Sequence, residues 1–290
     1  MGLKAKFNLV MLVAFLVGLA LAAALAYQIV QDNARREVLQ NAALMMEEAS
    51  AIRAYTAREI APLLADQSKI HFQPQTVPAF AAQDNFRKLQ QDFPDYSYRE
   101  PALNPTNPAD RAQPFEADII ETFRRKPKLA QLITERNTAT GPAMSLSRPL
   151  RANDKECLTC HSTPAAAPVS MIELYGSDNG FGWKLGDVIA AQVVSVPEQV
   201  ALDRANRTFA IFLAGLVVVF AVMVVLLNLL LHYVIVRPVR RISAIAGEVS
   251  LGNMEAPDFT VKGRDEIASL AESFNRMRRS LANALRMLEE

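Results

Sequence analysis

The sequence lacks an excess of charge of either sign, because its 290 residues carry 31 lysines and arginines against 30 aspartates and glutamates. A nucleic-acid partner needs a concentrated basic surface, so this balance argues against one. Cysteine is scarce, and two residues cannot supply a framework of disulfides. Aromatic residues make up 7% of the chain although apolar residues make up 51%, so the apolar content lies mainly in aliphatic side chains.

Two long aliphatic runs account for much of that content. No charged residue occurs from Leu9 to Ala26 or from Phe209 to Val236. Each run can cross a hydrocarbon core of ~30 Å as a helix. We therefore predict transmembrane helices over residues 7–30 and 208–236. Ala24-Leu25-Ala26 also resembles a signal-peptidase site, so cleavage of the first run stays an alternative.

Basic residues next to both runs predict the topology. Lys4 and Lys6 precede the first run, and Arg237, Arg240 and Arg241 follow the second. Under the positive-inside rule, residues 1–6 and 237–290 belong in the cytoplasm. Residues 31–207 then face outward, and we expect the periplasm, with the helices in the lipid of a bacterial inner membrane.

The region between the runs has its own composition, since 14 of the 16 prolines lie from Pro62 to Pro197. Such a segment is typical of a mixed α/β domain with long loops around a site. A helix is expected to leave the membrane over residues 31–64 and to end at Pro62. Further expected elements are short helices over 115–123 and 128–135 and a strand over 185–196.

The chemistry concentrates in Cys157-Leu158-Thr159-Cys160-His161. Two thiols three residues apart can each add to a vinyl group of haem, and the adjacent imidazole can then bind the iron. We predict one covalent haem c per chain, attached through Cys157 and Cys160, with His161 as the proximal ligand. Export of this region agrees with the prediction, because haem c is attached outside the cytoplasm.

Three other interpretations of the motif fit less well. A structural zinc site needs further ligands, and outside the motif the expected exported region offers only His71 and no cysteine. A thioredoxin-type dithiol needs a strand before it and a helix after it, whereas residues 153–156 are polar and typical of a loop. A disulfide between Cys157 and Cys160 would be strained.

The second axial position of the iron stays open. His71 is a candidate distal ligand, with an exposed loop histidine as the alternative. Four methionines are also candidates, although a buried methionine ordinarily fills the core: Met45, Met46, Met144 and Met171. A vacant position would indicate gas binding, and a filled one would favour electron transfer or redox sensing.

Other side chains could contact the haem periphery. Phenol and guanidinium donors suit the propionates, and the candidates are Tyr96, Tyr98, Arg99 and Arg148. Trp183 follows Gly180-Phe181-Gly182, where the glycines let a ring approach a backbone or a cofactor closely. Packing of Trp183 on the haem edge and simple burial in the core are both open.

Two amphipathic segments follow the second aliphatic run. The first places Ile242, Ile245 and Val249 at helical spacing, and a connector with Gly252 and Pro257 comes after it. The second alternates spacings of three and four over Ile267, Leu270, Phe274, Met277, Leu281, Ala284 and Leu288. Such a seam predicts a homodimer that forms a parallel four-helix coiled coil, with a hairpin on the membrane surface as the alternative.

These motifs also resemble known families. Residues 237–290 resemble a HAMP signal-relay domain through Pro238, Gly252 and Asp265-Glu266-Ile267. The exported region resembles the Tll0287-like haem domain family. That second resemblance rests on five segments, which are residues 52–56, 76–80, 104–108, 157–161 and 180–184.

The resemblance implies an α+β chain with a PAS-like haem domain, in which His161 is the proximal ligand. In one member of that family a cysteine outside the haem motif is the distal ligand, and this sequence has no such cysteine.

We therefore expect a haem sensor of redox state or of a small gas, without enzymatic activity. After residue 290 no kinase, cyclase or methyl-accepting domain follows, so a separate cytoplasmic protein should receive the signal. The alternative function is a membrane-anchored cytochrome that only transfers electrons.

Overall fold

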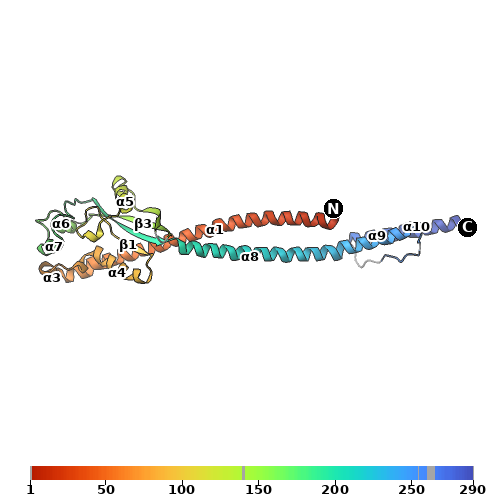
Figure 1. Ribbon diagram of the computed structural model, residues 1–290, viewed down its shortest axis with the longest axis horizontal. Coiled ribbons are helices and arrows are strands. Elements are labelled where there is room, and N and C mark those ends of the chain that lie inside the picture. Colours follow the sequence, from red (N-terminus) through yellow and green to blue (C-terminus); the bar gives the residue numbers. More distant parts are fainter. Residues whose placement is uncertain (1, 139–140, 254, 260–264, 290) are drawn as a thin grey trace. The chain divides into compact units, whose positions relative to one another are not determined.

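The computed structural model describes residues 2–138, 141–253, 255–259 and 265–289. The chain divides into two compact units (Figure 1). One unit is Gln28–Thr208, and the other combines Met1–Tyr27 with Phe209–Glu290. Helices and a small antiparallel sheet make up the fold.

The first unit is built on a four-stranded sheet in the order β1-β4-β3-β2, with all neighbours antiparallel. The strands are β1 (Ser97–Arg99), β2 (Leu132–Thr138), β3 (Gly141–Arg151) and β4 (Val188–Pro197). Residue 133 pairs with 146, and 146 pairs in turn with 194. β4 lies between two neighbours and is apolar on both faces, which explains the strand signal in its sequence.

Helices cover both faces of this sheet (Figure 1). On one face, α1 (Leu3–Tyr55) and α4 (Pro78–Asp92) pack on β3 and β4, with Val38, Met46 and Phe86 in the core beside Val194. On the other face lies α5 (Pro114–Arg125). Its core side chains Ile119, Ile120 and Phe123 contact Val188, Ala191 and Val193. Residues 193 and 194 therefore serve opposite faces, as the two-residue period of a strand requires.

The helix predicted over 128–135 is wrong, because residues 132–138 form strand β2. Every second residue of β2 is partly buried, and its backbone pairs with β3 from Leu132–Ser147 to Thr138–Gly141. The stability of this strand comes from its pairing with β3, which a local reading of the sequence does not contain.

The other expected elements of this unit are present with shifted ends. α1 continues past Tyr55 as a π-helical turn (Thr56–Ile60) and a short helix α2 (Ala61–Leu63), next to Pro62 as expected. The strand predicted over 185–196 is β4, and the helix predicted over 115–123 is α5. The remaining short elements are α3 (Ala65–Ile70), α6 (Lys155–His161), α7 (Val169–Tyr175) and single 3-10 turns at Pro74–Thr76 and Pro108–Asp110.

Among the residues that the structure describes, two helical stretches are long and apolar enough to span a membrane, Lys4–Leu63 and Gln199–Ser250. The second comprises α8 (Gln199–Leu230), a π-helical turn (Leu231–Val236) and α9 (Arg237–Ser250). These stretches match the two aliphatic runs and are consistent with a membrane protein.

The C-terminal part pairs α9 with α10 (Glu266–Glu289). Ile242, Ile245 and Val249 of α9 form an apolar cluster with Ala271, and Ile267 and Phe274 pack against it. Four residues of the predicted seam on α10 stay exposed in the single chain: Leu270, Met277, Leu281 and Ala284. The side chain of Leu288, the last predicted seam position, lies outside the described residues.

A connector residue is attached to α10 through its main chain. The buried Asn275 side chain accepts a hydrogen bond of 3.1 Å from the Phe259 amide and donates one of 2.8 Å to the Phe259 carbonyl. The Phe259 ring is itself buried in the apolar cluster of α9 and α10. The connector is thus fixed at this point by two separate sets of contacts.

Candidate functional site

Helix α6 carries both cysteines. It begins at Lys155, because the Asp154 side chain accepts a hydrogen bond of 3.3 Å from the Glu156 amide and caps the helix. The loop predicted for residues 153–156 is therefore wrong for its second half. Cys157 and Cys160 lie one turn apart on the same side of α6, as free and half-buried thiols. Burial, and to a smaller extent the neighbouring Cys157, raises the pKa of Cys160.

His161 ends α6 and is held through one ring nitrogen. Its Nδ1 lies 2.8 Å from the Gly180 carbonyl oxygen and 3.4 Å from Thr106 Oγ1. A carbonyl only accepts hydrogen bonds, so Nδ1 carries the proton and Nε2 keeps its lone pair. Burial lowers the pKa of His161, while the bond to Gly180 opposes this shift. A neutral imidazole fixed in this tautomer is suited to bind a metal through Nε2.

Trp183 fixes the orientation of the imidazole. Its ring is stacked on that of His161, with centroids 3.8 Å apart and an interplanar angle of 13°. The backbone adds to this contact, since the Trp183 amide donates to the His161 carbonyl at 3.2 Å and the Gly182 amide donates to Ser162 at 3.0 Å. Residues 180–183 thus form a strap along the end of α6.

A substitution at Gly180 tests this strap. A Cβ at Gly180 would collide with Thr106 Oγ1 and lie 2.9 Å from the Thr106 amide nitrogen, at a φ of +86°. Gly182 has a similar φ of +81°, but no atom within 4 Å of its Cβ position. We expect Gly180→Ala to lower the free energy of unfolding by about 2 kcal/mol or more, and Gly182→Ala by about 1 kcal/mol.

Thermal unfolding of the two glycine variants provides the measurement. Both carry the strain of a positive φ, so their difference isolates the collision with Thr106. Equal losses in the two variants would contradict the tight contact between residues 180 and 106.

Among the described residues, no distal-ligand candidate makes a hydrogen bond or ring contact with the His161 side chain. His71 is exposed and follows α3, with its amide donating to the Gln67 carbonyl at 2.9 Å. Within the described part of the chain no contact joins it to His161, so its role stays a prediction. The four candidate methionines are all buried: Met45, Met46 and Met144 in the core under α1, and Met171 on α7.

Three of the four candidate propionate contacts are engaged elsewhere. Tyr98 donates to Glu100 at 2.6 Å, Arg99 pairs with Glu116 at 3.0 Å, and Arg148 pairs with Glu47 at 2.7 Å. The fourth, Tyr96, stacks edge-on against Phe93. The structure does not bring this set to His161.

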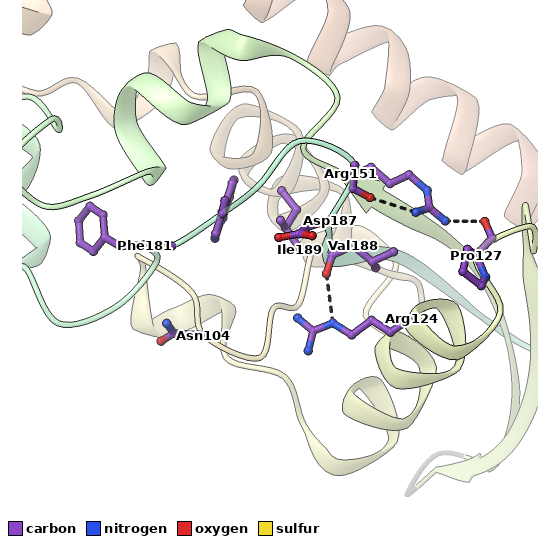
Figure 2. A pocket seen from close by; sticks show the side chains of 11 residues that line it. Asn104, Arg124, Pro127, Arg151, Phe181, Asp187, Val188 and Ile189 are labelled. Carbon is purple, nitrogen blue, oxygen red and sulfur yellow. Dashed lines mark hydrogen bonds between the residues drawn. The ribbon is translucent and has the colours of Figure 1, made fainter.

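A cavity of about 510 Å³ lies beside the strap (Figure 2). The strap contributes Phe181, Gly182 and Trp183 to its wall. Two cationic side chains that sequence reasoning missed, Arg124 of α5 and Arg151 at the end of β3, line it as well. No local pattern could have found them, because the fold alone brings residues 124, 151 and 183 together.

The donor set of the site fits a haem c group. Two free thiols lie on one side of α6, and the imidazole at its end has an available Nε2. Among the described residues no group of three or more histidine, cysteine, aspartate or glutamate side chains gathers as a metal-ion cage would require. The site thus offers one imidazole nitrogen and two free thiols.

Comparison with known proteins gives two family matches. Residues 31–197 match the Tll0287-like family, described as Tll0287, and residues 230–283 match the HAMP domain. The HAMP match includes α9, the connector and most of α10.

Among solved structures, the chain is similar to the crystal structure of the cyanobacterial heme-protein Tll0287. The two are 18% identical with a TM-score of 0.44, and the match covers 56% of this chain and 95% of that one. No curated protein sequence matches this chain. The Tll0287-like match spans more than half of the 290 residues and includes the whole of α6 and the strap, so this chain, which also carries a HAMP domain, belongs to the Tll0287-like family.

Proposed function

We propose that this chain is a sensor in a bacterial inner membrane, with one covalent haem c in a PAS-like periplasmic domain. The observation that carries the proposal is the arrangement of α6, where Cys157 and Cys160 precede an imidazole whose Nδ1 is bonded to Gly180. Each thiol would add its sulfur to one vinyl carbon of the haem and its proton to the other. His161 Nε2 would then bind the iron.

The bound haem would supply an iron whose oxidation state and outer ligand can change. Residues of this chain connect the proposed iron ligand His161 to the backbone segment that leads to α8. The strap runs through residues 184–187 directly into β4, and β4 is followed after Glu198 by α8. A shift of His161 can therefore pass through its contacts with the strap and then along the backbone to the helix that leads to the HAMP domain.

The relay needs two arrangements of the HAMP helices that differ little in free energy. In a homodimer the HAMP helices of two chains can adopt such alternative arrangements. The exposed apolar residues Leu270, Met277 and Leu281 on α10 support a homodimer, because a second chain would cover them. The signal would pass to a separate cytoplasmic protein. In this proposal the chain has no catalytic activity of its own.

The relay can be tested on the full chain without knowing its partner. Ser280 is exposed, and S280C would supply the one thiol that haem attachment leaves free. We expect the rate of cross-linking between two copies in membranes to differ among oxidised, reduced and carbon-monoxide-treated protein. Phe274→Glu, which places a charge in the apolar cluster of α9 and α10, should abolish that difference and leave the rate of haem reduction unchanged.

Ser273→Glu, at an exposed neighbouring position, is the matched control and should keep the difference. A cross-linking rate that is the same in every haem state would contradict the sensor function and favour an electron-transfer cytochrome.

A further inference from the structure

The cavity beside the strap has the size of a binding site. Its volume of about 510 Å³ falls in the range of small-molecule pockets. It lies between the strap, the end of α5, and the start of β4 (Figure 2). It is partly open to solvent, so a ligand can enter without unfolding the domain.

Two guanidinium groups give this cavity its charge. Arg151 donates to the Pro127 carbonyl at 2.7 Å and to the Gly186 carbonyl at 3.3 Å. Arg124 donates through Nε to the Val188 carbonyl at 3.2 Å (Figure 2). These carbonyls fix the two side chains but do not neutralise them, and each guanidinium keeps further N–H donors.

The acidic groups nearby do not cancel this charge. Arg151 has no ion-pair partner among the described residues. Arg124 pairs at 3.2 Å with Glu121, but both side chains are more than 40% exposed, so water screens that pair. Asp187 is the one acidic residue on the cavity wall, and its carboxylate accepts from the Lys184 amide at 3.0 Å. The two arginines and Asp187 together leave the cavity wall with one net positive charge.

Among the other side chains of the wall, Asn104 is polar and the rest are apolar or aromatic. Phe181 and Trp183 line one side of the cavity, and Val188 and Ile189 line another. A guanidinium binds a carboxylate through two parallel hydrogen bonds, and rings bury a flat or aliphatic body. The chemistry that matches both parts is a carboxylate on an apolar body.

We propose that this cavity is a carboxylate-binding site, with Arg151 as its main anchor and Arg124 as its second. The carboxylate can come from a propionate of the haem bound at α6, a source that rests on the proposed function, or from a free organic acid. In both cases the occupant contacts Trp183, whose ring is stacked on His161. Occupancy of the cavity is therefore transmitted to the axial ligand.

The test uses the detergent-solubilised full chain and two readouts. Isothermal titration measures binding of benzoate, with benzamide as the uncharged probe of the same shape. Redox titration measures the haem potential. The variants are Arg151→Gln and Arg124→Gln, with Arg151→Lys retaining the charge and Arg125→Gln as the control. Arg125 is exposed on α5 and is not part of the cavity wall.

A free-acid site predicts that benzoate binds the wild type and that Arg151→Gln weakens this binding about tenfold or more. Benzamide should bind weakly, and Arg151→Lys should restore part of the affinity. A propionate site predicts no benzoate binding, and a haem potential that shifts in Arg151→Gln but not in Arg125→Gln. Arg124→Gln gives the same readouts should Arg151→Gln fail to fold.

The proposal is overturned when benzoate does not bind and neither arginine variant changes the haem potential. A wild-type chain that carries no haem would refute the proposed function instead. The benzoate titration would still decide the free-acid site in that protein.

Discussion

Replacing both cysteines, in a Cys157→Ala and Cys160→Ala double variant, is expected to remove all covalently attached haem. Both side chains lie on one face of α6, and alanine favours helix, so the fold of α6 should persist. A denaturing gel stained for haem makes the measurement, and the intact mass of the wild type should exceed that of its polypeptide by one haem. Each single variant should keep one thioether bond.

Thr159→Ala is the matched control for the double variant. Thr159 lies between the two cysteines on the same helix and is exposed, so its change should leave haem attachment complete. Haem that survives denaturation in the double variant would contradict the assignment of the thiols. A wild type without haem would contradict the cofactor itself.

Removing Arg53 is expected to cause the largest loss of stability in the haem domain. Arg53 on α1 pairs with Glu100, whose side chain is 2% exposed. Tyr98 donates to the same carboxylate at 2.6 Å, and Gln192 of β4 donates to Tyr98 at 2.8 Å. Arg53→Met would leave a buried carboxylate without its cation, at a cost of about 3 kcal/mol. Thermal unfolding should show a drop of roughly 6–12 °C in Tm for a domain of this size.

An exposed ion pair provides the comparison for Arg53. Arg87 pairs with Asp84 at 2.8 Å, and both side chains are about half exposed. Arg87→Met should therefore cost less than about 1 kcal/mol. In the double variant Arg53→Met and Glu100→Gln, the unpaired charge is gone and part of the stability should return. Equal losses in Arg53→Met and Arg87→Met would show that burial of Glu100 does not govern this contact.

Sequence patterns predicted the parts of this structure that are local. The helix α10 and the strand β4 each follow from a pattern that repeats or ends within a short window. The mistaken helix over 128–135 shows the limit, because β2 exists through pairing with β3. The site has the same limit, since Thr106 reaches His161 across 55 residues and Gly180 across 19. Arg53 and Glu100, 47 residues apart, carried no sequence signal of their pairing.

The double attachment of the connector at Phe259 has an evolutionary consequence. Asn275 binds main-chain atoms that every residue possesses, so this bond survives any substitution at position 259 except proline, which lacks the amide hydrogen. The ring of Phe259, in contrast, serves only the apolar cluster. Related chains can therefore carry a different side chain at position 259, which changes the packing of the apolar cluster, while the hydrogen bonds from Asn275 still hold the main chain of the connector in place. A substitution at Asn275 would remove both hydrogen bonds to the main chain. Among related chains we therefore expect more substitutions at position 259 than at position 275.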